Sequence, residues 1–524
     1  MKKYFQFVLV FLALSVSANA QVFNEQSLKF ARLLDWVNNY YVDTVNSKQL
    51  VETAIVEMLR KLDPHSAYIS KEEMQEANEP LVGNFEGIGV SFNILHDTII
   101  IISPIPGGPS ERLGVMSGDK IIKIDGTVVA GKNITNKDVF KKLRGAKGTK
   151  VTIEIKRRLS NTLISYTIVR DKIPIYCIDA AYMLEPGIGY IRLARFSANT
   201  TTEFEAALSK LQAQNMKHLV LDLSGNGGGY LEEAINLADE FLEKGQLIVY
   251  TEGRSNPRQD FVASERGMLE KGRLAVVIDE GSASASEIVS GAIQDWDRGV
   301  IVGRRSFGKG LVQRGIPLTD GSMVRLTIAR YHTPTGRVIQ KSYSQGYDVY
   351  EKDIVDRYKN GEFVNKDSIK FPDSLRYYTL KKKKLVYGGG GIMPDVFVPL
   401  DTTAFPVYVR AAIRLGTIYQ FIVQYVDEYR TELKSLYPDF ETYKNKFIVE
   451  GQFRDAYIQY AVKQDSTLKP DSDPHNLAEL DMLLKAYLAR NIWDSNEFFQ
   501  IYNLRDNAVL KATEVIKNWK EYQK

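Results

Sequence analysis

Cysteine and histidine are both scarce in this 524-residue chain, which has one cysteine and five histidines. A single cysteine, Cys177, excludes a disulfide within the chain, so stability must come from packing. Because its neighbours Ile175, Tyr176 and Ile178 are apolar or aromatic, Cys177 is better interpreted as a buried filler than as a nucleophile. No histidine stands at ligand spacing from a cysteine or carboxylate, so we expect no metal site and no cofactor.

The chain also lacks a strong charge of either sign, and its formal net charge of +4 is too small and dispersed to predict nucleic-acid binding. Long apolar runs are missing, apart from one near the start. There Lys2 and Lys3 precede an apolar run over 7–16, and small residues lead up to Ala20. We expect a signal peptide cleaved after Ala20 and export to the periplasm, with no integral membrane segment left and membrane association open. An uncleaved anchor is the alternative, but the run is too short to span a bilayer.

The length predicts three or four domains. After a signal peptide over 1–20, residues 21–82 form a predicted helical segment, and residues 83–172 have the short strands and glycine turns of a β-rich module. Residues 173–400 alternate strand and helix, which predicts a largely parallel, layered α/β core. Residues 401–524 are predicted to be helical again, with packing or self-association as their expected role.

Three apolar strands are predicted to lead into helices in the α/β region, over 188–193, 219–223 and 274–278. Later strands lack intervening helices, so that part of the region is predicted to be antiparallel. These later strands are expected over 300–302, 311–316 and 324–331.

The third of those strands runs into Gly281-Ser-Ala-Ser-Ala-Ser-Glu-Ile288. Ser284 and Glu287 have the spacing of a helix capping box, a common structural device. A serine at this turn is also suited to nucleophilic chemistry, because a helix N-terminus offers free N–H groups to a developing oxyanion. On local grounds Ser282 and Ser286 are equal rivals.

Lys309 lies 25 residues after Ser284, within Phe307-Gly-Lys-Gly310. In a Ser–Lys pair a neutral amine takes the hydroxyl proton, so no histidine is needed. The pKa of Lys309 must then fall by several units through burial, which the flanking glycines favour. Gln313 falls on the same face as Lys309 and could hold the amine. A triad through His332 stays an alternative without local support.

Two glycine motifs resemble nucleotide-binding loops but lack a required residue. The segment from Gly303 to Gly310 has glycine where the P-loop needs Ser or Thr. The segment from Ser224 to Gly229 leads to Tyr230 where the dinucleotide fingerprint needs glycine. The second segment is better suited to supplying an N–H donor for an oxyanion.

Together these motifs resemble the C-terminal processing peptidases, also called tail-specific proteases, over roughly residues 30–400. The combination is specific, although each motif alone is weak. It comprises Leu62-Asp-Pro-His-Ser66, Phe85-Glu-Gly-Ile-Gly-Val90, Leu143-Arg-Gly145 with Gly148-Thr149, Leu221-Asp-Leu-Ser-Gly-Asn-Gly-Gly229, the serine motif, Phe307-Gly-Lys-Gly310 with Gln313, and Tyr331-His-Thr-Pro-Thr-Gly-Arg337.

The resemblance implies an α/β core of the ClpP/crotonase-like type, a PDZ domain in the β-rich module, and helical N- and C-terminal segments. It implies Ser284 as nucleophile, Lys309 as base and Gln313 as the residue that orients the lysine. The implied oxyanion donors are the backbone N–H groups of Ala285 and Gly228. The family more often has Arg-x-Asn-Pro-Gly-Gly in this loop, and the chain departs from it with Ser224 for the arginine and Gly227 for the proline.

The implied carboxylate-binding loop of the PDZ domain is Gly87, Ile88, Gly89 and Val90, although a plain glycine-containing edge strand is the alternative. We expect an exported serine endopeptidase that captures exposed C-terminal tails, with a possible adaptor protein and a possible homo-oligomer through the helical ends. The first rival function is a non-catalytic tail-binding or chaperone protein that uses the PDZ domain and has an inactive hydrolase domain. The second is a phosphate-binding enzyme that uses the segment from Gly303 to Gly310.

Overall fold

The computed structural model describes residues 24–95, 97–158, 160–265, 267–401, 406–469 and 473–523. The predicted signal peptide therefore lies outside the described residues. Within these ranges no helix has both the length and the apolar character needed to cross a membrane.

A six-stranded sheet forms the centre of the α/β core, in the order β10-β11-β12-β15-β16-β21. Only β10 and β11 are antiparallel, which confirms the predicted largely parallel sheet. Alternate residues are buried on opposite faces of the sheet. Val276 packs with the helices α7 (Thr200–Gln212), α8 (Leu231–Asp239) and α9 (Ala285–Asp295), and Val277 packs with α17 (Asn507–Lys517). The strands are β10 (Ile178–Glu185), β11 (Ile188–Leu193), β12 (His218–Asp222), β15 (Leu274–Ile278), β16 (Val300–Gly303) and β21 (Val396–Phe397).

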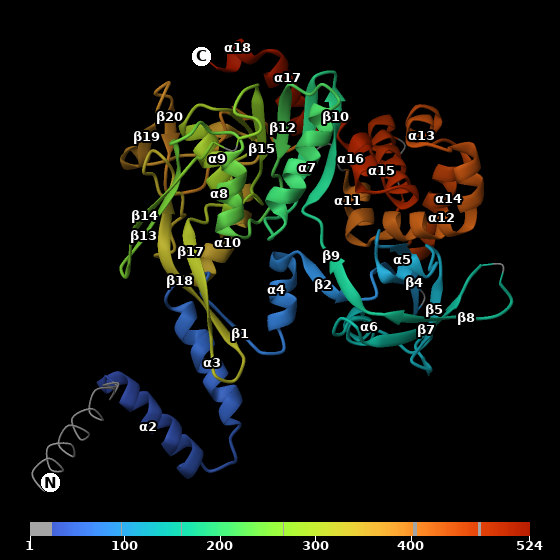
Figure 1. The fold of residues 1–524 in the computed structure, drawn as a ribbon, viewed down its shortest axis with the longest axis horizontal. Coiled ribbons are helices and arrows are strands. Elements are labelled where there is room, and N and C mark those ends of the chain that lie inside the picture. Colours follow the sequence, from blue (N-terminus) through green and yellow to red (C-terminus); the bar gives the residue numbers. More distant parts are fainter. Residues whose placement is uncertain are drawn as a thin grey trace, which may run out of the picture.

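The helices on the first face follow their strands in the chain, as the β-α alternation predicted (Figure 1). The buried residues of α7 and α8 are mostly apolar, whereas every residue of α9 is buried. The helices are α7 (Thr200–Gln212), α8 (Leu231–Asp239) and α9 (Ala285–Asp295).

A second sheet has the order β1-β18-β13-β14, with β17 also paired to β18. The antiparallel pairing of β17 and β18 confirms the prediction for the strands over 311–316 and 324–331. The prediction is wrong for the strand over 300–302, because α9 connects β15 to β16 and the two strands are parallel. The expectation of a wholly helical N-terminal segment is wrong, because this segment contains the strand β1. Three residues are too few to give a periodic signal, and β1 pairs with β18, which lies far away in the sequence. The strands are β1 (Ala67–Ile69), β13 (Leu247–Gly253), β14 (Asn256–Val262), β17 (Leu311–Pro317) and β18 (Met323–His332).

The β-rich module contains a sheet in the order β3-β4-β5-β7-β8, with β6 on β5, and a separate pair of β2 and β9. Its core is built from alternate aliphatic residues of these strands and from α6. The elements are β2 (Asn84–Gly87), β3 (Val90–Leu95), β4 (Thr98–Pro104), α5 (Pro109–Arg112), β5 (Lys120–Ile124), β6 (Thr127–Val128), α6 (Asn136–Leu143), β7 (Lys150–Lys156), β8 (Ile164–Val169) and β9 (Asp171–Pro174).

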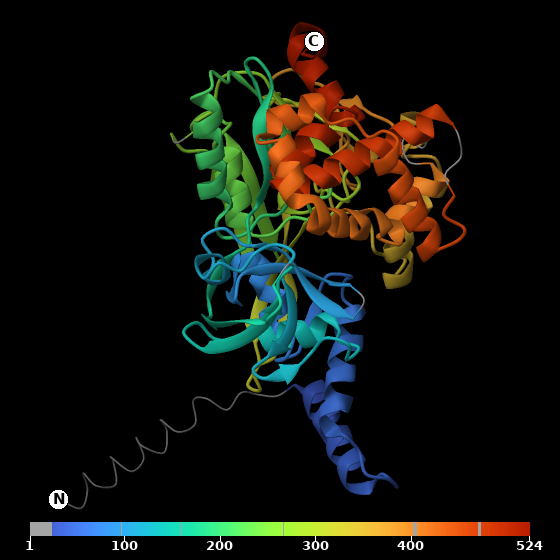
Figure 2. The ribbon, with the colours of Figure 1, turned by 90° about the vertical axis from the view of Figure 1, so that its right-hand side faces the viewer.

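Of the N-terminal helices, α2 and α3 extend away from the rest of the molecule, and none of the residues of α2 is buried (Figures 1 and 2). The third of them, α4, leads directly into β2 of the β-rich module. These helices are α2 (Glu25–Tyr40), α3 (Ser47–Arg60) and α4 (Met74–Val82).

The C-terminal helices form a core of their own, and the last of them also complete the α/β core (Figure 2). Helix α16 packs on β10, and α17 covers β12, β15 and β16 on the second face of the central sheet. Asp427 of α12 contacts the β-rich module, where its carbonyl oxygen accepts a 2.8 Å hydrogen bond from Arg158. The helices are α11 (Val407–Arg414), α12 (Thr417–Leu436), α13 (Phe440–Lys446), α14 (Gln452–Gln464), α15 (Pro474–Ile492), α16 (Ser495–Tyr502), α17 (Asn507–Lys517) and α18 (Trp519–Tyr522).

The remaining elements lie between β18 and β21 in the chain. The helix α10 has Tyr350 and Arg357 buried, and the two short strands pair with each other. They are α10 (Tyr347–Lys359), β19 (Arg376–Tyr378) and β20 (Leu385–Tyr387).

Candidate active site

Ser284 lies at the N-cap of α9, directly after the turn that follows β15. Its backbone has φ 55° and ψ −110°, a left-handed region that a non-glycine residue rarely adopts. Such strain persists only where the surrounding structure enforces it, and it concentrates at functional sites.

The two rival serines are occupied elsewhere. Ser282 is fully buried, and its hydroxyl donates a 2.8 Å hydrogen bond to the carbonyl oxygen of Leu223. Ser286 is also fully buried, and its hydroxyl donates to the carbonyl oxygen of Asn226 at 2.8 Å. Of the three serines, Ser284 alone lines the cavity described below.

Lys309 precedes β17 and also lines that cavity. Its Nζ donates to Oε1 of Gln313 at 3.2 Å. Among the described residues no hydrogen bond joins this amine to the Ser284 hydroxyl, but both residues line the same cavity. Gly310 allows the close packing expected around the lysine, since a Cβ there would lie 2.8 Å from the backbone nitrogen of Gln340.

The environment of Lys309 favours the neutral amine. Burial lowers the pKa of Lys309 below its ordinary value of 10.5, and the positive charge of Arg325 lowers it further. The negative charges of Glu287 and Asp63 oppose this shift without reversing it. A lysine with a lowered pKa can serve as a base closer to neutral pH.

Glu287 joins the serine and the lysine through their backbones. One carboxylate oxygen accepts the N–H groups of Ser284 and Lys309, each at 2.8 Å. The other accepts the Gly308 N–H at 2.7 Å and the Ser306 hydroxyl at 2.5 Å. Burial raises the pKa of Glu287 to about 7, and the four donors counteract that rise. The capping-box pattern predicted the contact of Glu287 with Ser284, but it did not predict the hydrogen bonds from the other three donors.

Gln313 is held from its far side by the turn between α3 and β1. Its Nε2 donates to the carbonyl oxygen of His65, which leaves Oε1 facing Lys309. The turn is fixed by Asp63, whose carboxylate accepts the His65 N–H at 2.8 Å and the Thr327 hydroxyl at 3.1 Å. From the sequence, the segment 62–66 is predicted to end a helix and is one of the motifs of the family resemblance, but neither observation predicts a contact with Gln313. Its link to Gln313 spans 248 positions and has no local signal.

The glycine loop (residues 224–229) brings Gly228 against the serine turn. A Cβ on Gly228 would lie 2.8 Å from Cβ of Ser284 and 2.9 Å from the nitrogen of Ala285, so only glycine fits. The Ala285 N–H lies in the first turn of α9, where helical N–H groups have no helical partner. The Gly228 N–H donates to Oδ1 of Asn226 at 2.9 Å, so binding an oxyanion there requires an exchange of this bond.

A cavity of about 1050 Å³ contains all five predicted residues of the catalytic site, Ser284, Lys309, Gln313, Gly228 and Ala285. Its wall is largely apolar, as suits the side chains of an extended peptide. The apolar lining includes Leu231, Ile235, Phe261, Ile288, Leu311 and Val312.

His332, the alternative partner for the serine, is engaged outside this cavity. Its ring stacks on Tyr250 with a centroid distance of 4.4 Å, and its Nδ1 lies 3.2 Å from the carbonyl oxygen of Gly336. The structure gives the triad through His332 no support.

The predicted carboxylate-binding loop joins β2 to β3. Gly87 ends β2, Ile88 and Gly89 form the link, and Val90 begins β3. Within the described residues β3 pairs only with β4, so its other edge is open to an added strand. Phe140 of α6 contacts β3, with its ring 5.5 Å from the ring of Phe92. An open strand edge next to a helix is the arrangement by which PDZ domains bind peptides.

Comparisons with known proteins agree with this geometry. Residues 187–348 match peptidase family S41, and residues 100–157 match the PDZ domain. Residues 13–73 match the N-terminal domain of the activating protease CtpB, and residues 408–494 match a family of unknown function.

The chain is 36% identical over 398 residues to the carboxy-terminal-processing protease of Bartonella bacilliformis, which covers 75% of this chain and 89% of that protein. It is 34% identical to the carboxy-terminal processing protease CtpB of Bacillus subtilis, over 62% of this chain and 69% of that protein. A solved photosystem II D1 C-terminal processing protease is 29% identical and covers 61% of this chain and 91% of that chain, with a TM-score of 0.34. The chain therefore belongs to the carboxy-terminal-processing proteases of peptidase family S41 and is a serine-type peptidase with a PDZ domain.

Proposed function

We propose that this protease is an exported endopeptidase that captures the C-terminal tails of proteins and cleaves them with Ser284 and Lys309. The observation that carries the proposal is the single cavity that holds Ser284, Lys309 and Gln313 next to the N–H groups of Ala285 and Gly228. A nucleophile, a base with a lowered pKa and two backbone donors are the parts that acyl transfer requires.

In the proposed reaction the neutral amine of Lys309 moves from Gln313 to the Ser284 hydroxyl and takes its proton. The serine oxygen bonds to the scissile carbonyl carbon, and the Ala285 and Gly228 N–H groups hold the oxyanion. The C–N bond then breaks, and the leaving amine takes the proton from the lysine. Water attacks the resulting ester while Lys309 accepts its proton, which releases the new carboxyl terminus and returns the proton to Ser284.

Tail capture is assigned to the PDZ domain. A free C-terminal carboxylate binds the backbone N–H groups of the loop at Gly87, Ile88, Gly89 and Val90, and the tail adds as a strand along β3. Support comes from the open edge of β3 and from α4, which links the two sites: its residues Asn78 and Leu81 line the catalytic cavity, and it leads into β2.

Export and self-association complete the proposal. The charged and apolar pattern over 1–20 supports cleavage after Ala20 and a periplasmic protein. Helix α2 has no buried residue and exposes Leu28, Leu33 and Trp36, which supports association of the N-terminal ends of two copies. Light scattering of a variant with these three residues changed to serine tests this last part, since a wild-type monomer would contradict it.

The test of catalysis is cleavage of a stable protein that carries an unstructured C-terminal tail. Ser284→Ala should abolish cleavage while tail binding is retained. Ser290→Ala is the matched control, because Ser290 is a buried serine of α9 whose hydroxyl donates a 2.7 Å hydrogen bond to the Ser286 carbonyl oxygen. Undiminished turnover in Ser284→Ala would refute the assignment, and wild-type binding without cleavage would favour the non-catalytic rival.

A further inference from the structure

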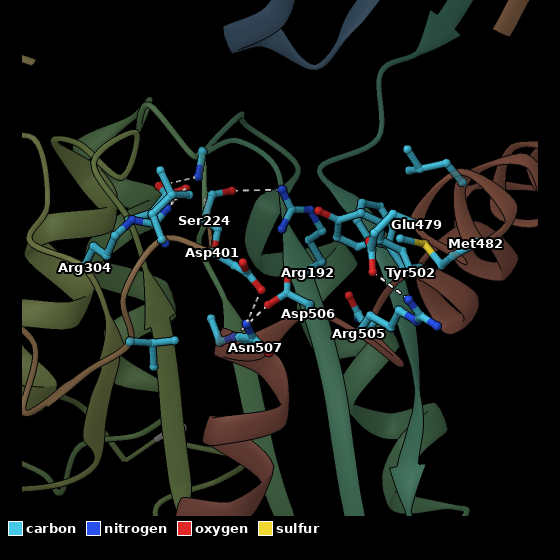
Figure 3. Close-up of a pocket in the computed structure, with 18 of the residues that line it drawn as sticks. Arg192, Ser224, Arg304, Asp401, Glu479, Met482, Tyr502, Arg505, Asp506 and Asn507 are labelled. Carbon is cyan, nitrogen blue, oxygen red and sulfur yellow. Dashed lines mark hydrogen bonds and ion pairs between the residues drawn. The ribbon is translucent and has the colours of Figure 1, made fainter. Parts of the chain in front are cut away.

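A second cavity of about 460 Å³, here called the rear cavity, is lined by the start of the glycine loop, and Ser284 is not among its lining residues (Figure 3). Ser224 and Gly225 line this rear cavity, whereas Gly227, Gly228 and Gly229 line the catalytic one. The opposite wall of the rear cavity comes from the C-terminal helices α15, α16 and α17. One short loop thus separates the proposed oxyanion site from the C-terminal region.

Arg192 of β11 holds the start of that loop. Its guanidinium donates to Oδ2 of Asp222 at 2.5 Å and to the carbonyl oxygen of Ser224 at 2.9 Å, the contact drawn in Figure 3. The other oxygen of Asp222 accepts the Ser224 N–H at 2.8 Å. The Arg192–Asp222 pair therefore fixes the backbone of Ser224 at both its N–H and its carbonyl group.

The pair is well shielded and geometrically restricted. The side chain of Asp222 is 3% exposed, and its Oδ2 also accepts the hydroxyl of Tyr190 at 2.7 Å. Because the guanidinium is a planar fork, it can contact Asp222 and Ser224 at the same time. A lysine in its place keeps the charge but offers only one compact ammonium group.

Helix α16 of the C-terminal region covers the guanidinium. The Phe499 ring lies against it, 4.8 Å from its central carbon. The helix is fastened to β10, the neighbour of β11, because Asn496 accepts the Ala181 N–H at 2.9 Å and the Phe499 carbonyl oxygen accepts the Tyr182 hydroxyl at 3.2 Å. These bonds fix the position of Phe499 relative to Arg192.

We propose that Arg192 is a positioning residue for the oxyanion loop, and that Phe499 of the C-terminal region keeps Arg192 in place. The inference rests on the proposed function, in which Gly228 of this loop stabilises the oxyanion. The Ser224 side chain is short, and the backbone of Ser224 is held instead by the guanidinium of Arg192 from β11. A shift of about 1 Å in a positioned group can cost about 100-fold in rate, so a loosened loop should lower kcat.

Arg192→Lys is the main test, because it keeps a positive charge beside Asp222 and so preserves the fold. We expect kcat for the tailed substrate to fall about 10- to 100-fold with KM nearly unchanged, and labelling of Ser284 by a fluorophosphonate to slow by a similar factor. Phe499→Leu should lower kcat by a smaller factor. Arg505→Lys is the control: Arg505 lines the same cavity but pairs with Glu479 at 2.6 Å, and its kcat should equal that of the wild type.

A direct role for the guanidinium can be read from chemical rescue. Arg192→Ala opens space next to the rear cavity, and guanidinium chloride well below denaturing concentrations should restore part of its kcat. The same salt should leave Ser284→Ala inactive.

Wild-type kcat in a folded Arg192→Lys would overturn the inference, while an inactive Ser284→Ala would still uphold the proposed function. An impaired but folded Arg192→Ala without rescue would overturn the direct role of the guanidinium. If the Arg192 variants do not fold, Phe499→Leu decides, since a normal kcat there overturns the part assigned to α16.

Discussion

Exchanging Glu287 for glutamine removes one acceptor oxygen from the point where Ser284 and Lys309 are joined. The carboxylate now accepts four donors, two at each oxygen. A glutamine amide has one oxygen and one NH₂ group, so in either orientation two donors face another donor. When the NH₂ group replaces Oε2, these two are the N–H groups of Ser284 and Lys309.

Two opposing effects determine how the substitution changes stability. Two buried donors without acceptors cost about 2–6 kcal/mol together. The substitution also removes a buried charge, and a rise of the Glu287 pKa from 4.5 to about 7 means that this charge costs about 3 kcal/mol above pH 7. The net change in the free energy of unfolding should therefore stay within about 3 kcal/mol. A displaced Ser284 or Lys309 should lower kcat about 100-fold.

The assay is steady-state cleavage of the tailed substrate at pH 8, together with urea unfolding of the same preparations. Glu240→Gln is the matched control, because burial also raises the pKa of Glu240 to about 7, yet Glu240 accepts the Met268 N–H and lies outside the catalytic cavity. The control should keep its kcat. A folded Glu287→Gln variant with wild-type kcat would refute the reasoning.

Three further predictions concern charge, strain and the buried core. Because the reaction needs neutral Lys309, kcat/KM should increase with pH, with a midpoint below 10.5. Arg325→Met should move this midpoint to higher pH, because it removes a positive charge that lowers the lysine pKa. An unmoved midpoint would count against a lysine base. Ser284→Gly should be about 1 kcal/mol more stable to urea than Ser284→Ala, since glycine tolerates φ 55°, and equal stabilities would show that the turn is unstrained. Arg337→Met should lower the free energy of unfolding by about 3–5 kcal/mol, because it leaves Asp295 buried without its 2.7 Å ion pair, and a loss below 1 kcal/mol would contradict that assignment.

The main strands could be predicted because their burial is written into local sequence. The strand predicted over 274–278 matches β15 at both ends, since five consecutive apolar residues between polar ones suit a strand buried on both faces. The sequence also predicts a helix over 137–143, which is α6, and the antiparallel pair of β17 and β18. By contrast, the sequence predicts a helix over 231–243, whereas α8 ends at Asp239, because the apolar pattern continues past the helix.

The catalytic pairing was not predictable from spacing alone. Ser282, Ser284 and Ser286 were equivalent in local sequence, and the family resemblance made the choice that the cavity geometry supports. Contacts across the fold gave no signal at all. The bond from Gln313 to His65 and the contact of Phe499 with Arg192 both join segments hundreds of residues apart, so they depend on the assembled tertiary structure.

The most direct test of a serine activated by a lysine is mass spectrometry of the protein after reaction with a fluorophosphonate at pH 8. We expect one adduct on the peptide that contains Ser284, no adduct in Ser284→Ala, and at least 100-fold slower labelling in Lys309→Ala, since loss of a general base costs about 10²- to 10⁴-fold. Labelling of Ser284 at the wild-type rate in a folded Lys309→Ala variant would contradict activation of the serine by the lysine.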